Sequence, residues 1–369
     1  MILDFLIDKL SETTYPTIEQ KKCLYQIGDK GCEKCVQNCP NGAISIDSKG
    51  IRIDNEICNN CGICRAVCPT QSIYNKELGE VNILRIIKEK RNPVFSCKMR
   101  DLDGNIKVSC LNAIHAELLA ALFILYKDNT LYFNTNNCED CEFNLSCQSE
   151  CNEIEESSLF IESLNKATDF VKKLGISPKY MLLNDEKRIS ILCEEVVSRR
   201  ELFQLLGKGS TNLAVNALDT IVGEDDQVSI RDYLLEIINK NEYNIPDDNE
   251  FFTFFNVTDN CNGCGICADT CPGKAWKIEE IENNISVFHN GGKCFDCGIC
   301  ISKCPNNAIE KAINGTSEKL EFKIKKEIKL SICSTCGKKF VPESFDQKIC
   351  NVCTKKISLR EKIASMDIL

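Results

Sequence analysis

Short apolar segments alternate with longer helical patterns across residues 92–187. The segments NPVFSC and GNIKVSC have the length and apolar content of strands, and each ends in a cysteine, Cys97 or Cys110. TLYFNTNNC and, near residue 180, YMLL predict two more strands. NAIHAELLAALFIL predicts a buried helix with Asn112 placed to cap it, and SSLFIESLNKATDFVKKLG predicts a helix ended by glycine. This alternation predicts a small α/β domain whose mostly parallel sheet carries cysteines at its strand ends.

Helical patterns also occupy residues 188–250, which we expect to be a helical linker. SRRELFQLLG in this segment pairs Ser198 with Glu201 as a capping box and stops at Gly207, as an ordinary amphipathic helix does. Its twin arginines resemble an export signal, but such signals act at an N-terminus. The lone Cys193 is expected to be an inert helix residue. We further expect a helix over residues 1–19 and a tail over residues 358–369.

Cysteine sets the composition apart, with 27 cysteines in 369 residues against 2 histidines and 1 tryptophan. A chain of this length can bury an ordinary core and does not need disulfides for stability. Its first residues lack the basic leader of a signal peptide, and its longest apolar run is too short to span a bilayer. We therefore expect a reducing cytoplasm in which the thiolates hold metal. The net charge of -9 argues against nonspecific binding of nucleic acid.

Four copies of one motif contain most of these cysteines. Three copies have two, two and three residues between their cysteines and end in proline: Cys58, Cys61, Cys64 and Cys68; Cys261, Cys264, Cys267 and Cys271; Cys294, Cys297, Cys300 and Cys304. The altered copy has eight residues after Cys23 and continues with Cys32, Cys35 and Cys39. This is the bacterial spacing for iron–sulfur ligation, in which three cysteines wrap one cluster and the fourth reaches its neighbour. The alternative, four zinc sites without a redox role, does not require this run.

With their tails NGAISID, TQSIYN, GKAWKIE and NNAIEKA, residues 20–80 and 251–315 each resemble a bacterial-type two-cluster ferredoxin. The resemblance implies four 4Fe-4S clusters with crossed ligation. In the first module it assigns one cluster to Cys23, Cys32, Cys35 and Cys68 and another to Cys39, Cys58, Cys61 and Cys64. In the second module it assigns one to Cys261, Cys264, Cys267 and Cys304 and another to Cys271, Cys294, Cys297 and Cys300. The insertion after Cys23 departs from the family pattern and leaves the nuclearity of the first cluster open.

Residues 92–187 resemble the iron–sulfur delta subunit of methyl-viologen-reducing hydrogenases through VSCLNAI and CEDC. That resemblance implies a further cluster, 2Fe-2S or another type, on Cys97, Cys110, Cys138 and Cys141. It also implies redox partners of the hydrogenase, dehydrogenase or heterodisulfide-reductase type. Alternatively, Cys147 and Cys151 complete a local site with Cys138 and Cys141, or the thiols are buried and inert.

A further four-thiolate site is predicted over residues 330–357, where two C-x2-C pairs supply Cys333, Cys336, Cys350 and Cys353. Zinc is the expected metal of this ribbon, and iron in a rubredoxin-like site is the competitor. The neighbouring lysines lack interleaved aromatic residues, so we expect a surface that docks protein and not nucleic acid.

The sequence contains no glycine motif for binding a nucleotide phosphate or a dinucleotide, and both histidines are expected to be structural. We therefore expect an α+β multidomain protein that is a non-catalytic electron-transfer subunit, relaying single electrons between redox enzymes of an anaerobe. A competing hypothesis is an enzyme whose central cysteines bind a cluster and reduce a disulfide or a small substrate. A third is a redox-sensing adaptor whose ribbon docks on a transcription or assembly machine.

Overall fold

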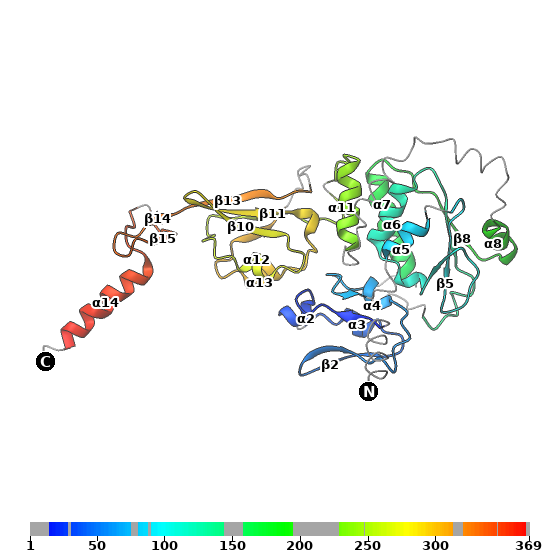
Figure 1. Ribbon diagram of the computed structural model, residues 1–369, viewed down its shortest axis with the longest axis horizontal. Coiled ribbons are helices and arrows are strands. Elements are labelled where there is room, and N and C mark those ends of the chain that lie inside the picture. Colours follow the sequence, from blue (N-terminus) through cyan, green and yellow to red (C-terminus); the bar gives the residue numbers. More distant parts are fainter. Residues whose placement is uncertain are drawn as a thin grey trace, which may run out of the picture. The chain divides into compact units, whose positions relative to one another are not determined.

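A computed structural model of the chain describes residues 15–28, 31–74, 80–87, 90–143, 158–194, 229–246, 248–312, 320–344 and 346–366 (Figure 1). They fall into two compact units, one ending at Phe251 and the other beginning at Phe252. Because the relative placement of the two units is not determined, each is described by itself. No helix within the described ranges has the length and apolar character needed to cross a membrane.

The first unit opens with two small antiparallel ladders. Strand β1 (Thr17–Ile18) pairs with β4 (Ile73–Tyr74), and β2 (Ile44–Asp47) pairs with β3 (Gly50–Ile53). The short helices α2 (Leu24–Ile27), α3 (Lys34–Gln37) and α4 (Ile63–Ala66) carry or follow cysteines of the motifs. The helix expected over residues 1–19 is wrong at Thr17–Ile18, which pair with β4 and close this module, and residues 1–14 lie outside the described ranges.

A four-stranded parallel sheet forms the centre of the same unit, as the alternating pattern predicts. Its strands are β5 (Val94–Cys97), β6 (Ile106–Val108), β7 (Leu131–Asn134) and β8 (Tyr180–Leu183), in the order β6-β5-β7-β8. Helices α5 (Glu80–Ile87), α6 (Ala116–Leu125), α7 (Leu159–Lys173) and α8 (Glu186–Cys193) accompany the sheet. Since parallel strands end at one edge, the cysteines at the ends of β5 and β6 meet there.

The start of α6 differs from the prediction. A 3-10 turn, η2 (Leu111–Ala113), intervenes, so the helix begins at Ala116 and His115 caps it by accepting the Glu117 N–H at 3.2 Å. Asn112, the expected cap, instead donates to the Phe143 carbonyl at 2.7 Å and accepts the Phe160 N–H at 2.9 Å. This amide therefore joins the loop after β7 to the start of α7.

Helix α11 (Ile230–Lys240) is more than a linker, because most of its residues are buried and it packs against α6. Arg231 on α11 forms an ion pair with Glu117 on α6, and both side chains are almost fully buried. Phe251 packs edge-on against Phe170 of α7, with ring centroids 4.7 Å apart. The capping box of Ser198 and Glu201 lies outside the described residues.

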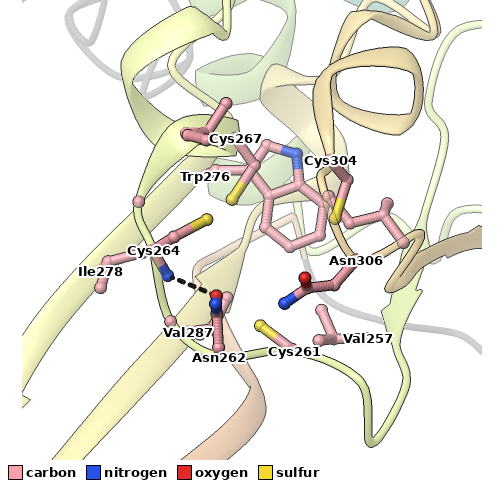
Figure 2. Close-up of a pocket in the computed structure, with 14 residues that line it drawn as sticks. Val257, Cys261, Asn262, Cys264, Cys267, Trp276, Ile278, Val287, Cys304 and Asn306 are labelled. Atoms are coloured by element: carbon pink, nitrogen blue, oxygen red, sulfur yellow. Dashed lines mark hydrogen bonds between the residues drawn. The ribbon is translucent and has the colours of Figure 1, made fainter. Parts of the chain in front are cut away.

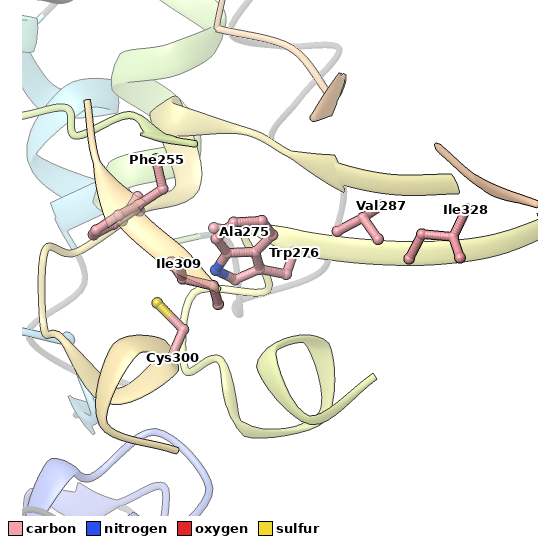
Figure 3. Packing of buried hydrophobic residues seen from close by; sticks show 8 residues of the cluster. Phe255, Ala275, Trp276, Val287, Cys300, Ile309 and Ile328 are labelled. Atoms are coloured by element: carbon pink, nitrogen blue, oxygen red, sulfur yellow. The ribbon is translucent and has the colours of Figure 1, made fainter. Parts of the chain in front are cut away.

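The second unit is mainly antiparallel. Strands β10 (Trp276–Ile281), β11 (Asn284–His289) and β13 (Lys323–Lys329) form one sheet, and β9 (Phe255–Val257) pairs with β12 (Ile309–Lys311). Short helices α12 (Ile266–Thr270) and α13 (Ile299–Lys303) and the 3-10 turn η3 (Gly291–Lys293) complete the module. Figure 3 shows Phe255, Trp276 and Ile309 packed in its core near Cys300.

The end of the chain forms a small ladder and a long helix. Strand β14 (Ser331–Ile332) pairs with β15 (Lys339–Phe340), and α14 (Asn351–Met366) follows. The tail expected from residue 358 onward is therefore wrong for most of its length, because α14 continues through it to Met366.

Candidate metal centres

The first module gathers its motif cysteines into two groups. Burial raises the pKa of the Cys35 thiol to about 12, and the neighbouring thiols that add to this rise are Cys68, Cys23 and Cys32. Burial likewise raises the pKa of Cys64, with further contributions from Cys61, Cys58, Cys35 and Cys39. Cys23, Cys32, Cys35 and Cys68 line one pocket, and Cys39 also contributes to the raised pKa values of Cys58 and Cys61. Each group thus joins three thiols of one motif to the last thiol of the other, and Cys35 lies near both groups. Such thiols are hard to ionise without a metal, so metal binding must displace their protons.

The second module has the same arrangement. Burial, followed by Cys261, raises the pKa of Cys267 to about 12, while Cys304 contributes to the rise at Cys261. Figure 2 shows Cys261, Cys264, Cys267 and Cys304 around one pocket, where Asn262 accepts the Cys264 N–H at 3.2 Å. Near the other group, burial raises the pKa of Cys294, and Cys271, Cys300 and Cys297 add to the rise.

A common turn follows the last cysteine of every motif. The third residue after it has a left-handed backbone, with φ of 64° at Gly42, 52° at Gln71, 51° at Lys274 and 47° at Asn307. The fourth residue after it donates its N–H to the cysteine sulfur, at 3.2 Å from Ala43, 3.3 Å from Ser72, 3.2 Å from Ala275 and 3.3 Å from Ala308. The turn therefore aims a backbone dipole at a sulfur that becomes negative on metal binding.

The altered motif differs at the entry to its helix. In the three regular copies, a left-handed glycine caps the helix, with φ of 82° at Gly62, 86° at Gly265 and 71° at Gly298. In the altered copy the cap of α3 is Glu33, with φ of -123°. The longer loop between Cys23 and Cys32 therefore enters its helix by a different path while still placing Cys35 on the first turn.

Sequence reasoning missed the aromatic neighbour of one thiol. Burial raises the pKa of Cys300 to about 11, and a hydrogen bond from the Trp276 side chain opposes this rise. The sequence placed Trp276 at the start of a strand, but no motif or spacing predicted that it would contact Cys300. Trp276 and Cys300 meet because both are buried in the core cluster of the second module.

At the carboxyl edge of the parallel sheet, Cys97, Cys110, Cys138 and Cys141 line a cavity of about 430 Å3. A hydrogen bond from Cys110 lowers the pKa of Cys97 to about 6, and the same bond, with burial, raises the pKa of Cys110. Burial raises the pKa of Cys138 to about 11, and Cys141 and Cys97 add to this rise. The four central thiols therefore lie together, whereas Cys147 and Cys151 fall outside the described residues.

One thiol that lines the central cavity, Cys110, lies beside a thiol of the first module. Cys61 and Cys110 belong to one buried cluster with Ile63, Phe143 and Leu159, and Cys61 contributes to the raised pKa of Cys110. Helix α4 packs against η2 at this place. A thiol of the second motif and a thiol of the central domain are thus neighbours, although 49 positions separate them in the sequence.

The ribbon cysteines are spaced for a single ion. The sulfurs of Cys333, Cys336, Cys350 and Cys353 all lie within 4.8 Å of one another, and those of Cys336 and Cys350 are 3.9 Å apart. A tetrahedral ion with bonds of about 2.3 Å places its sulfurs about 3.8 Å apart. In the described part of the chain, no other set of three or more candidate ligands is this compact.

Comparisons with known proteins agree with the geometry of the two modules. Residues 30–72 and residues 255–309 each match a family model described as a 4Fe-4S dicluster domain. A ferredoxin of Alicyclobacillus acidocaldarius is 35% identical over 66 residues, which cover 18% of this chain and 83% of that protein. These modules are therefore iron–sulfur domains of the electron-transfer type. The chain belongs to the ferredoxin family, and the prediction of two ferredoxin modules is confirmed.

Two further relatives are components of larger assemblies. One component of an ion-translocating oxidoreductase complex of Methanosarcina acetivorans is 42% identical over 52 residues, 14% of this chain and 20% of that relative. The PorD component of the pyruvate synthase of Methanocaldococcus jannaschii is 37% identical over 62 residues, 16% of this chain and 65% of that relative. The chain thus spans about a fifth of the length of the first relative and just under two thirds of the second.

Proposed function

We propose that this protein is an electron-transfer subunit that relays single electrons between partner redox enzymes through four 4Fe-4S clusters. The observation that carries the proposal is the crossed grouping of thiols in both modules, where three cysteines of one motif line a pocket together with the last cysteine of the other. When bound, each cluster supplies one-electron chemistry. The ligand sets are those implied by the ferredoxin resemblance, with Cys23, Cys32, Cys35 and Cys68 for the first cluster.

The protein's own residues would hold and tune these clusters. Backbone N–H groups at Ala43, Ser72, Ala275 and Ala308 stabilise negative charge on the sulfurs they face. Burial of Cys64 and Cys294 excludes water from two ligand sets. No residue of the relay has to accept a proton or a substrate for electrons to pass.

We also propose a cluster on Cys97, Cys110, Cys138 and Cys141 as the junction between the first module and a partner. Its support is the packing of Cys61 and Cys110 in one buried group of side chains, since two iron–sulfur clusters held by neighbouring thiols lie close enough to exchange electrons. The four central thiols line a cavity of about 430 Å3, which is more room than a single ion needs and favours a cluster. The ribbon itself would hold zinc.

The partners we propose are subunits of multi-subunit oxidoreductases of the hydrogenase, dehydrogenase or heterodisulfide-reductase type, in a reducing cytoplasm. Two relatives carry names of such assemblies, an ion-translocating oxidoreductase complex and a pyruvate synthase. Each match lies within a short part of this chain, so these names indicate the kind of partner and not its identity.

Metal analysis of anaerobically purified protein tests the proposal. We expect about sixteen irons and sixteen sulfides for the four cubanes, a further excess of both for the central cluster, and about one zinc per chain. Stepwise reduction should give electron paramagnetic resonance (EPR) signals from the clusters, and Cys138→Ala should remove only the excess. Cys193→Ala is the matched control, because Cys193 ends α8 and is not among the residues that line the cavity. Absence of cluster signals in the intact protein would refute the relay.

The central cavity also favours a second candidate, a cluster-dependent reductase of a disulfide or a small substrate. Its volume of about 430 Å3 lies in the range of pockets that bind small molecules. Dye-linked reduction of a disulfide by the isolated chain, lost in Cys138→Ala but retained in Cys193→Ala, would support this function. Inactivity in the same assay, with all clusters present, would rule out the reductase and favour the electron-transfer function.

A further inference from the structure

The four equivalent turns differ in the residue that donates its N–H to the cysteine sulfur. The residue that donates its N–H to the last cysteine of each motif is alanine at positions 43, 275 and 308, but it is Ser72 in the second motif. The Ser72 hydroxyl oxygen lies 3.2 Å from the Cys68 sulfur, in addition to the backbone N–H at 3.3 Å. Both residues are buried, with 2% of Ser72 and 7% of Cys68 exposed.

The chemistry of the pair decides which atom donates. A cysteine that ligates iron is a thiolate without a proton, so the Ser72 hydroxyl must be the donor. Thr70 also brings a hydroxyl to within 3.8 Å of the same sulfur, but it donates to the Lys22 carbonyl at 2.7 Å. Cys68 therefore accepts one hydroxyl hydrogen bond, from Ser72, beyond what the common turn provides.

The surroundings hold Ser72 in position. Its carbonyl accepts the Glu19 N–H at 2.7 Å, which anchors the strand that begins after the turn. The preceding Gln71 donates its side-chain amide to the buried Glu117 carboxylate at 3.0 Å, and Arg231 in turn pairs with Glu117. These contacts hold the backbone of the turn in place, with the Ser72 hydroxyl next to the Cys68 sulfur.

We propose that Ser72 tunes the reduction potential of the first cluster, held by Cys23, Cys32, Cys35 and Cys68, to a less negative value. Reduction adds one electron to the cluster and increases the negative charge on its sulfurs, and a hydrogen-bond donor stabilises that charge. The hydroxyl therefore favours the reduced state of this cluster, so electrons remain longer there than an alanine would allow. This inference rests on the proposed ligand set.

Ser72→Ala tests it, because alanine is the residue that the same turn accepts at three other positions. In an EPR-monitored potentiometric titration of the whole protein, the midpoint of one cluster should shift to a more negative potential. The midpoints of the other clusters and the iron content should stay unchanged. Ser72→Thr keeps a hydroxyl, so its midpoint should stay close to that of the unaltered protein. Thr70→Val removes a buried hydroxyl bonded to Lys22 and should shift no midpoint.

Two outcomes overturn the inference. Unchanged midpoints in Ser72→Ala, with full iron content, would show that the hydroxyl does not act on the cluster. Equal shifts in Ser72→Ala and Thr70→Val would show a general effect of loosening the turn. Either result leaves the four-cluster relay intact, whereas absence of cluster signals in the unaltered protein would refute the proposed function itself.

Discussion

Replacing Arg231 with methionine tests how the described parts of the first unit are joined. Arg231 donates to Glu117 from Nε to Oε2 at 3.0 Å and from Nη2 to Oε1 at 2.5 Å, and from Nη1 to the Phe251 carbonyl at 2.7 Å. Burial is the largest single effect and raises the pKa of Glu117. The charge of Arg231, together with His115 and the hydrogen bonds from Arg231 and Gln71, more than offsets burial and holds that pKa below its usual value. In Arg231→Met, Gln71 would be the remaining side-chain donor to Glu117 within the described part of the chain.

The expected cost follows from burial, since only 7% of the Arg231 side chain and 3% of the Glu117 side chain are exposed. Removing one partner of a buried ion pair costs about 3 to 5 kcal/mol, because the other charge stays buried without compensation. At about 1.4 kcal/mol per factor of ten, amide hydrogens protected by this packing should exchange roughly a hundredfold to several thousandfold faster.

Hydrogen exchange measured by mass spectrometry on peptides from α6 and α11 would detect this change. Lys240→Met is the matched control on α11, because its pair with Glu236 is 41% and 31% exposed and should cost about 0.5 kcal/mol, roughly a twofold change in rate. Adding Glu117→Leu to Arg231→Met should recover most of the protection, since an apolar replacement removes the stranded charge. Similar exchange rates in Arg231→Met and Lys240→Met would refute the reasoning.

Three further predictions concern the second unit. Burial, followed by the charge of Lys325, lowers the pKa of His289 to about 3. In the unfolded chain this histidine titrates at about 6.5, so its contribution to the free energy of unfolding is fully present above that pH. Below it, the free energy of unfolding falls by about 1.4 kcal/mol per pH unit. His289→Phe should abolish this slope between pH 7 and 5 in urea unfolding followed by the fluorescence of Trp276, and a persistent slope would assign it to other groups. Cys336→Ser should release about one metal ion per chain while iron stays constant, measured by elemental analysis, and loss of iron instead would place iron in the ribbon. In Gly298→Ala the new Cβ has no neighbouring atom within 4 Å, so the variant should lose only the backbone strain energy of a φ of 71°, about 1 to 2 kcal/mol, measured by thermal unfolding. A larger loss of stability would mean that the loop itself rearranges.

Local patterns in the sequence predicted the elements that depend on neighbouring residues. The β-branched and aromatic strands of the central sheet, the helix ended before Gly175, and the short strand after each motif all appear in the structure. Predictions that needed distant partners were less successful. Asn112 does not cap α6, because Phe143 and Phe160 engage its side chain, and α11 is part of a packed unit because Arg231 meets Glu117.

The sequence by itself determined the cysteine loops of the protein, because ligand spacing, the proline that follows and the left-handed turn are properties of a few adjacent residues. It therefore indicated two ferredoxin modules and a four-thiolate ribbon. Only the tertiary structure brought Cys61 beside Cys110, placed Trp276 against Cys300 and added the Ser72 hydroxyl to Cys68 within a buried turn. The first two contacts join residues distant in the chain, and the third depends on an orientation fixed by Glu19 and Glu117, so packing decided all three.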